Sequence, residues 1–333
     1  MSGSVDVLAI ITGFIASIVI YNISLLYGTV GEIIIEKSGS LNLGVEGTMA
    51  IGAILGYLAG CMTNNFFLAV IVSFIGAGLC GLIFAVLTVT LQANQNVTGL
   101  TMTTFGIGLY FFIGRGLGDK WPALLNISNM KAANNQISIP LLSKIPVIGE
   151  AFFNRSILTY IGIIIAVLAW AYLKYTKYGL KLRAVGENPA TADSAGVKVT
   201  IYKYVHIIIG SGIMGIGGLN MGLILGGSFE GSTCWINGYG WIAIALVIFA
   251  NWNPSLAILG TFVFGLFNSL QYYSGSLVYA FPHALGWLSN IPSQFFKALP
   301  FIITAIVLII SSINKNRSAQ PSAIGMNYFR EDR

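Results

Sequence analysis

The chain has 333 residues, of which 56% are hydrophobic and only 8% are charged. A soluble domain usually carries about 25% charged residues, whereas residues 47–114 and 231–296 contain no Asp, Glu, Lys or Arg. A transmembrane helix needs roughly 20 mostly apolar residues, so each block has room for about three crossings. The composition excludes a soluble protein, and the alternating pattern of a membrane β-barrel does not occur in the sequence.

The charged and metal-binding residue types exclude several functions. The net charge of +6, from 17 basic and 11 acidic residues, is explained by cytoplasmic loops that collect Lys and Arg, so we expect no nucleic-acid partner. Cys61, Cys80 and Cys234 lie in or beside apolar segments, and this odd, scattered set argues against disulfides. The two histidines and the lack of P-loop, zinc-protease and Gly-x-Ser-x-Gly motifs predict no catalytic residue, metal or cofactor on this chain.

Nine apolar runs follow one another along the chain and predict an all-α, polytopic transmembrane helix bundle of about nine crossings. The first run lacks a preceding positive region, which favours an uncleaved helix over a signal peptide. We expect one transmembrane domain over residues 1–313 and a cytoplasmic C-terminal tail over residues 314–333. The runs cover residues 5–27, 41–61, 66–91, 97–113, 157–173, 204–225, 239–250, 256–270 and 299–313.

The basic residues predict the orientation of the bundle. Six of them lie within residues 174–203, and four more follow residue 313. The positive-inside rule places both segments in the cytoplasm, and the four apolar runs between them, an even number, agree with this. Counting backwards places residues 116–155 and the N-terminus outside.

Residues 174–203 form a hydrophilic island between two apolar halves. We expect it to be the cytoplasmic segment through which a component outside the membrane moves the membrane helices. Asn188 followed by Pro189 is typical of a helix start, with Asn as the cap and Pro as the first residue. Gly196 suits the end of that helix.

Glu46 is the sharpest single candidate, because an ionised group inside a bilayer is costly unless it faces a cavity, a partner or water. Either it lines a solute path or fixes a broken helix, or it is a structural acid bonded to backbone amides. Glu230 has similar alternatives, and solvation at an outer mouth would also explain it. The amides around Asn94 and Asn96 suit contact with hydroxyl-rich or base-like solutes, but we favour a solvated turn.

Small residues and a short internal similarity indicate how the helices could pack. Gly52, Gly56 and Gly60 line one helix face, which predicts close helix packing or, less simply, a moving interface. Residues 39–44 resemble residues 217–222, and each segment is followed by an acid. Because transporters are often built from two repeats, we keep a weak internal repeat as a hypothesis.

Four segments together resemble a known family. Because of their order and spacing over residues 29–272, the chain is similar to permease subunits of bacterial ABC importers of the branched-chain amino acid, ribose and nucleoside permease family. Within that family it looks most like the shorter permease of nucleoside-type systems. The segments are GEIIIEKSGSLNLGVEG (31–47), ANQNVTGL (93–100), GLKLRAVGENP (179–189, with AGV at 195–197) and GWIAIAL (240–246, with WNP at 252–254).

The resemblance implies partners: a second permease subunit, ATPase subunits that hold ATP and Mg, and an extracellular solute-binding lipoprotein. It also implies that a short cytoplasmic helix around residues 184–196 docks on the ATPase. The residues we assign to this contact are Ala184, Gly186, Glu187, Asn188, Pro189, Asp193 and Gly196. The residues we assign to the solute path are Asn42, Glu46, Asn94, Asn96 and Glu230. One departure is EGSTCWING at 230–238, where relatives tend to carry an Arg-containing segment.

We therefore expect a non-enzymatic permease subunit of an ATP-driven importer of nucleosides or simple sugars, in a bacterial cytoplasmic membrane. Two other classes stay open. A stand-alone secondary transporter would use Glu46 or Glu230 as its coupling acid, and a membrane scaffold would show no dependence on a solute. The capped cytoplasmic helix, together with a single acid expected deep in the membrane, favours the importer.

Overall fold

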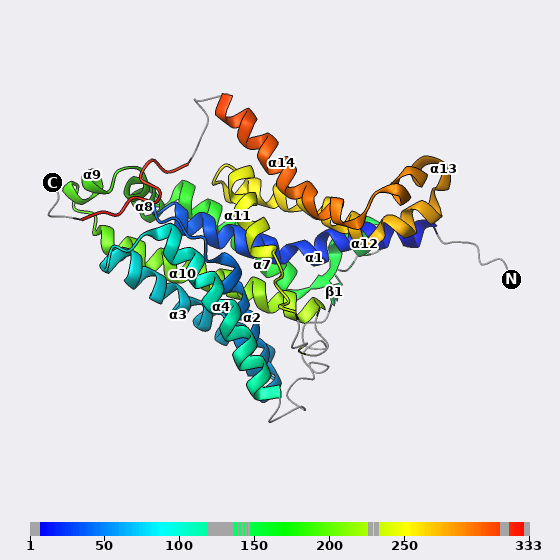
Figure 1. Ribbon diagram of the computed structural model, residues 1–333, viewed down its shortest axis with the longest axis horizontal. Helices are drawn as coiled ribbons and strands as arrows, with labels where there is room; N and C mark the ends of the chain where they lie inside the picture. Colours follow the sequence, from blue (N-terminus) through cyan, green and yellow to red (C-terminus); the bar gives the residue numbers. More distant parts are fainter. Residues whose placement is uncertain are drawn as a thin grey trace.

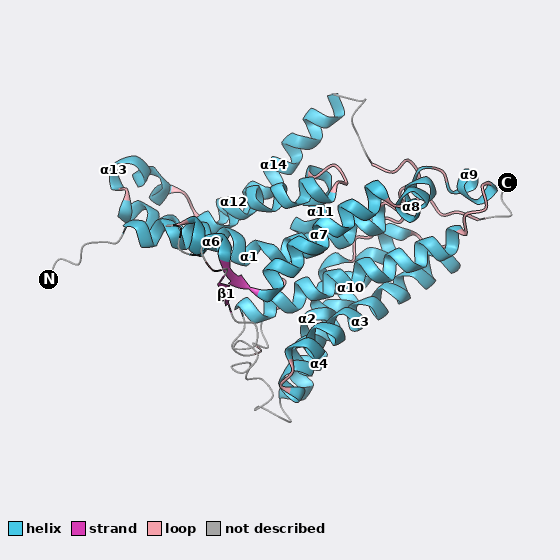
Figure 2. Ribbon diagram, turned by 180° about the vertical axis from the view of Figure 1, so that it is seen from behind, coloured by secondary structure: helices cyan, strands magenta, loops and turns pink. Residues whose placement is uncertain are grey.

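The computed structural model describes residues 7–118, 136–138, 140, 143, 145, 147–225, 229, 233–313 and 320–329. Helices dominate this part of the chain, and the one small sheet pairs β1 (Gln136–Ser138) with β2 (Asn154–Ser156) in antiparallel register (Figures 1 and 2). The all-α expectation is confirmed. The helices are α1 (Val7–Glu36), α2 (Val45–Thr63), α3 (Phe66–Ala85) with its π-helical continuation η1 (Val86–Thr90), α4 (Gln95–Gly118), α6 (Ile148–Phe153), α7 (Ile157–Tyr175), α8 (Lys177–Glu187), α9 (Pro189–Ser194), α10 (Val199–Leu225), α11 (Tyr239–Phe249), α12 (Pro254–Ala280), α13 (Pro282–Leu285), η4 (Gly286–Asn290) and α14 (Ser293–Ile313).

Each of the nine predicted runs coincides with a helix of the described part. Six helices are long and apolar enough to cross a membrane (α1, α2, α3 with η1, α4, α7 and α10), which confirms a polytopic bundle. The two parts of α12, Pro254–Leu270 and Tyr272–Ala280, meet at an angle of 72° and form either a seventh, broken span or a re-entrant loop. The count of nine crossings stays a prediction, because α11 and the apolar part of α14 are shorter than a full span.

Glycines bring the helices of the core close together. A Cβ atom added to Gly52 of α2 would overlap the backbone of Gly215 in α10, and one added to Gly31 of α1 would overlap the carbonyl of Gly210 in α10. Without side chains at these points the helix backbones approach closely, which supplies packing that the hydrophobic effect does not provide in lipid. The structure supports the packing interpretation of the glycine pattern.

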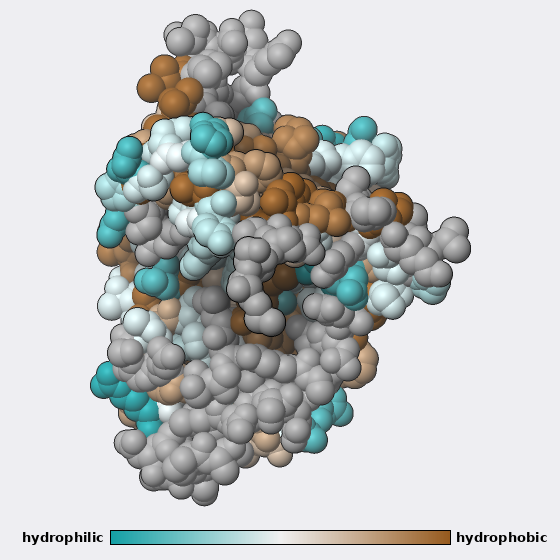
Figure 3. All heavy atoms as spheres, turned by 90° about the vertical axis from the view of Figure 1, so that its right-hand side faces the viewer, coloured by the Kyte–Doolittle hydropathy of each residue, from teal (hydrophilic) through white to brown (hydrophobic). Residues whose placement is uncertain are grey.

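The ends of the bundle differ in what they carry. The helices α8 and α9 lie at one end together with residues 320–329, and the start of α1 and α13 lie at the other (Figure 1). We call the first of these the α8–α9 end. A view onto the opposite end shows brown apolar side chains that reach the surface between polar ones (Figure 3).

Candidate functional site

The basic island folds into two helices, α8 and α9, where we expected one helix around residues 184–196. Thr176 Oγ1 accepts a hydrogen bond from Gly179 N at 3.0 Å and caps α8, which ends at Glu187. Asn188 Oδ1 accepts from Thr191 N at 3.0 Å and caps α9, with Pro189 as its first residue. Gly196, two residues after the last residue of α9, has a φ of +79°. The predicted cap, start and stop are therefore confirmed.

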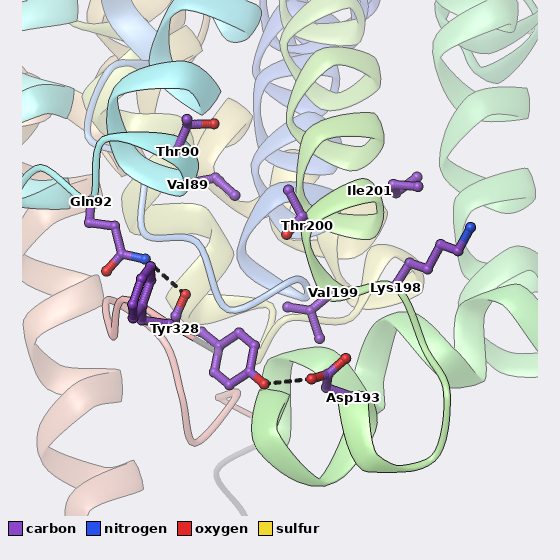
Figure 4. A pocket seen from close by; sticks show the side chains of 10 residues that line it. Val89, Thr90, Gln92, Asp193, Lys198, Val199, Thr200, Ile201 and Tyr328 are labelled. Carbon is purple, nitrogen blue, oxygen red and sulfur yellow. Dashed lines mark hydrogen bonds between the residues drawn. The ribbon is translucent and has the colours of Figure 1, made fainter. Parts of the chain in front are cut away.

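The two acids of the island face the C-terminal part of the chain. We call residues 320–329 the strap. Glu187 Oε2 accepts hydrogen bonds from Ser322 N at 3.2 Å and from Ser322 Oγ at 2.7 Å. Asp193 Oδ2 accepts from Tyr328 Oη at 2.9 Å (Figure 4). Both carboxylates therefore have partners inside this chain, although we had assigned them to an ATPase contact.

The strap also binds the turn before α4 and the loop after α1. Gln92 Nε2 donates to Tyr328 O at 3.0 Å, and Asn327 Nδ2 donates to Gln92 O at 2.6 Å (Figure 4). Gly325 N donates to Gly39 O at 3.2 Å. A cavity of about 540 Å³ opens beside Tyr328, between Gln92 and α9. The strap thus ties three segments that are far apart in sequence.

The exposed face of α9 is formed by small and neutral side chains. Thr191 and Ser194 are exposed, as is Ala195 directly after the helix, whereas Ala192 packs inward. These three residues lie inside the predicted helix at 184–196 but were not among the assigned contact residues, because the sequence does not show which side of α9 faces outward. Of the assigned coupling residues, Ala184, Glu187, Asn188 and Gly196 are exposed, Pro189 and Asp193 are half-buried, and Gly186 is buried against the carbonyl of Lys37.

Glu46 joins the first turns of two helices. It lies in the first turn of α2 and is only 4% exposed. Its Oε1 accepts from Gly238 N at 2.6 Å and its Oε2 accepts from Gly240 N at 2.7 Å, at the start of α11. Negative charge at a helix N-terminus is favourable because backbone N–H groups and the helix dipole point towards it. The structure therefore supports the alternative in which Glu46 is a structural acid bonded to backbone amides. Through these bonds Glu46 also fixes the start of the short helix α11.

Asn42 takes part in a buried polar cluster that sequence reasoning only partly identified. Its Nδ2 donates to Glu32 Oε2 at 3.0 Å, and its Oδ1 accepts from Gly44 N at 2.9 Å. Trp252 Nε1 donates to Glu36 Oε2. Glu32 and Glu36 are both buried inside the protein, whereas the expectation of a single acid deep in the membrane stays a prediction. Their i, i+4 spacing on α1 was the available signal, because it places both on one helix face.

The remaining path candidates do not line a common site with Asn42 and Glu46. Asn94 is exposed, and its Oδ1 accepts from Val97 N at 3.1 Å as a cap of α4. Asn96 is exposed in the first turn of the same helix. These contacts support the interpretation as a turn. Glu230 lies outside the described residues.

A second polar cluster lies between α1, α11 and α12. Asn268 Nδ2 donates to Tyr239 Oη at 2.7 Å and to Asn22 Oδ1 at 3.3 Å. The rings of Tyr21 and Tyr272 stack with centroids 5.5 Å apart. Amides inside apolar runs were the only sequence signal for this cluster. Within the described residues no group of three or more His, Cys, Asp or Glu side chains could hold a metal ion.

Comparison with known proteins identifies the family. Residues 11–310 match the family model described as a branched-chain amino acid transport system / permease component. The chain is 34% identical to the putative glucose ABC transporter permease protein TsgC13 of Haloferax volcanii, over 92% of this chain and 94% of that protein. It is 34% identical to the nucleoside ABC transporter permease protein NupC of Lactococcus lactis subsp. cremoris (95% and 96% covered) and 30% identical to the guanosine ABC transporter permease protein NupQ of Bacillus subtilis (98% and 100% covered). No solved structure matches. The chain belongs to the family of branched-chain amino acid transport system permease components.

Proposed function

We propose that this chain is the non-enzymatic permease subunit of an ATP-driven importer of nucleosides or simple sugars, and that a separate ATPase docks on α9. The observation that carries the proposal is the capped helix α9, whose exposed face of Thr191, Ser194 and Ala195 lies at the end of a membrane-embedded bundle. The names of the relatives, which specify glucose, nucleoside and guanosine transporters, support the substrate classes.

The same proposal fixes an orientation and a set of partners. Lys and Arg collect on cytoplasmic loops, and the α8–α9 end carries six basic residues within 174–203. We therefore place this end and the strap in the cytoplasm, with the protein in a bacterial cytoplasmic membrane. The partners are the ATPase, a second permease subunit and an extracellular solute-binding lipoprotein. ATP and Mg belong to the ATPase.

The solute path runs, in this proposal, past the cluster of Asn22, Tyr239 and Asn268. Amide and hydroxyl groups offer both donors and acceptors without the cost of a buried charge. The stacked pair of Tyr21 and Tyr272 next to them offers flat apolar surface, which suits a nucleobase or a sugar ring. Glu46 acts beside the path by holding the start of α11 rather than by binding solute.

The alternative of an ion-coupled secondary transporter is favoured by one observation, the burial of three carboxylates at Glu32, Glu36 and Glu46. Each of them accepts a hydrogen bond from a neighbouring amide, indole or backbone N–H. Both oxygens of Glu46 are bonded in this way, whereas Glu32 Oε1 is buried with no hydrogen-bond partner among the described residues. The family and the relatives favour the importer.

The test is copurification of the tagged chain with its ATPase, combined with a transport assay. The assay measures uptake of radiolabelled nucleoside and glucose by vesicles that are loaded with ATP. Ser194→Trp places bulk on the exposed face of α9, and Leu180→Trp, on the exposed side of α8, is the matched control. We expect wild type and the control to retain the ATPase and ATP-dependent uptake, and Ser194→Trp to lose both. Wild type that carries no ATPase, yet takes up solute on an ion gradient, would overturn the proposal.

A further inference from the structure

A basic cavity lies at the α8–α9 end, apart from the exposed face of α9. It has a volume of about 240 Å³ and lies between the end of α7, α8 and the turn that leads into α12. Its walls combine three cations with aromatic and aliphatic surface: Lys37, Lys174, Arg183, Trp170, Trp252 and Leu256. Such a combination suits a ligand with an anionic part and an apolar part.

The positive charge of the cavity is only partly compensated. Lys174 and Arg183 are exposed, and Lys174 Nζ lies 5.0 Å from the ring centroid of Trp170. The acids that act on Lys37 are Glu187 and Glu36. Glu187 accepts hydrogen bonds from Ser322, and Glu36 accepts one from Trp252. Three cations against two carboxylates leave a net positive charge around the cavity, which attracts an anion.

The start of α12 adds to this attraction. Pro254, the first residue of α12, lines the cavity, and the helix continues without a bend to Leu270. A helix N-terminus carries the positive end of the macrodipole and favours nearby negative charge. The cations and the helix end therefore act in the same direction.

An apolar surface continues from the cavity along the helices. Leu256 lines the cavity, and it shares one exposed face of α12 with Leu259 and Leu266, because residues three and seven positions apart lie on the same side of a helix. On α7, Ile164 and Val167 are exposed one to two turns before Trp170. A small free anion would not use these surfaces, whereas acyl chains would cover them.

We propose that this cavity binds the headgroup of an anionic phospholipid, with the acyl chains lying along the exposed faces of α7 and α12. Basic pockets between transmembrane helices on the cytoplasmic side bind such headgroups. The inference rests on the proposed cytoplasmic placement of the α8–α9 end. It does not depend on the transported solute or on where the ATPase docks.

The experiment is a lipid titration of the delipidated, purified full chain, followed by native mass spectrometry. The probes are long-chain phosphatidylglycerol, phosphatidylcholine, short-chain dibutyryl phosphatidylglycerol and inorganic phosphate. The test variant is Lys174→Gln with Arg183→Gln. The matched control is Lys177→Gln with Lys181→Gln, since both lysines are exposed on α8 and neither lines the cavity.

We expect wild type and the control to prefer long-chain phosphatidylglycerol over the other probes. The cavity variant should lose roughly tenfold to thirtyfold in affinity for it, as expected for two basic side chains near an anionic lipid. A second variant, Leu259→Ser, should keep the headgroup preference and weaken only the long-chain lipid. Because no ATP or solute is present, failure here is distinguishable from failure of the proposed function.

Three results would overturn the inference. Equal phosphatidylglycerol binding by the cavity variant and the control would show that the cavity does not select the lipid. Displacement of the lipid by inorganic phosphate would assign the cavity to a free anion. Loss of the copurified ATPase from the cavity variant, with lipid binding unchanged, would assign it to a protein contact.

Discussion

Glu46 shows how hydrogen bonds offset part of the cost of burying a carboxylate. Removing a charge from water is expensive unless hydrogen bonds compensate it. Here the two carboxylate oxygens accept from Gly238 N and Gly240 N, at distances of 2.6 and 2.7 Å. Helix α11 has 11 residues. At a rise of about 1.5 Å per residue, the helix is roughly 16 Å long from its first turn to its other end, which lies beside Trp252. Glu46 therefore holds the start of a helix whose length is about half the thickness of a bilayer core.

Glu46→Gln should destabilise the protein by about 1–3 kcal/mol, because a glutamine side chain presents one amide NH₂ to a backbone N–H and leaves that donor unpaired. The thermal unfolding midpoint in detergent measures this. The exposed cap Asn94→Ala is the control and should cost about 1 kcal/mol or less. An unchanged midpoint for Glu46→Gln would contradict the structural role.

Lys37 predicts a pH dependence of stability. Burial lowers the pKa of Lys37 to about 8, an effect that Arg183 adds to and that Glu187 and Glu36 oppose. An unfolded lysine titrates near about 10.4, so between these values the unfolded state binds more protons and stability rises with pH. The variant Lys37→Met has no titrating group at this position and therefore lacks this rise in stability with pH. The unfolding midpoint of wild type should therefore rise relative to that of the variant from pH 7 to pH 10.

The control for this prediction is Lys181→Met, which removes an exposed lysine from α8. Its unfolding midpoint should keep a constant offset from wild type over the same pH range. Parallel curves for Lys37→Met and wild type would show that the Lys37 ammonium is solvated as well in the folded protein as in the unfolded chain.

Asn268 tests the proposed path. Asn268→Leu removes the hydrogen bonds to Tyr239 and Asn22 and replaces an amide by an apolar group. A net hydrogen bond contributes about 1 kcal/mol, so we expect the KM for nucleoside uptake to rise about fivefold or more. Thr261→Val is the matched control, because Thr261 is buried on the same helix and, within the described part of the chain, its hydroxyl bonds to Ala257 O of its own helix. An unchanged KM for Asn268→Leu would exclude this cluster from the path.

At the scale of elements, helix contacts depend on the absence of side chains at particular positions. A Cβ at Gly52 would meet backbone atoms of Gly215, which cannot move without separating α2 from α10. By contrast, a Cβ at Gly108 of α4 would meet nothing within 4 Å. The two glycines therefore differ in role, although the sequence shows both as glycines inside apolar helices.

Gly52→Ala should destabilise the protein by about 1–3 kcal/mol through overpacking. The control Gly108→Ala should be neutral or stabilising by up to about 1 kcal/mol, because Ala favours helix over Gly. The unfolding midpoint and the monodisperse fraction in detergent measure both. If Gly52→Ala behaved like Gly108→Ala, the α2–α10 contact would be looser than the structure shows.

Each of the nine apolar runs that hydropathy predicted coincides with a helix, because apolar length is a local property of the sequence. Local capping likewise predicted Asn188, Pro189 and Gly196. What the sequence did not reveal depends on long-range contacts. Neither the bonding of Glu46 to Gly238 nor the burial of Glu32 can be deduced without knowing which helices are neighbours. The strap escaped prediction for the same reason, since its mixture of small, amide, aliphatic and aromatic residues has no periodicity that would indicate its contacts.

At the scale of the whole molecule, the strap links the proposed docking helix to loops that lead into the bundle. Ser322 and Tyr328 bond to α8 and α9 residues, and Gly325 bonds to the loop before α2. Gln95 joins these contacts, because its Nε2 donates to Asn327 Oδ1 at 3.0 Å and its Oε1 accepts from Leu41 N at 2.7 Å. A displacement of α9 would thus be carried to the starts of both α2 and α4.

Weakening the strap should therefore uncouple transport from ATP hydrolysis without preventing assembly. Ser322→Ala with Tyr328→Phe removes the side-chain hydrogen bonds to Glu187 and Asp193 and leaves the exposed face of α9 unchanged. Each bond contributes about 1 kcal/mol, so the population of molecules in which the strap is attached to α8 and α9 should fall several-fold relative to those in which it is detached. We expect the ATPase to copurify as with wild type, while solute taken up per ATP hydrolysed falls in reconstituted vesicles.

Met326→Ala, which changes a side chain that is 62% exposed on the same strap, should leave the ratio unchanged. An unaltered ratio in the double variant would mean that the strap only stabilises the fold, and loss of the ATPase would mean that it shapes the docking surface itself.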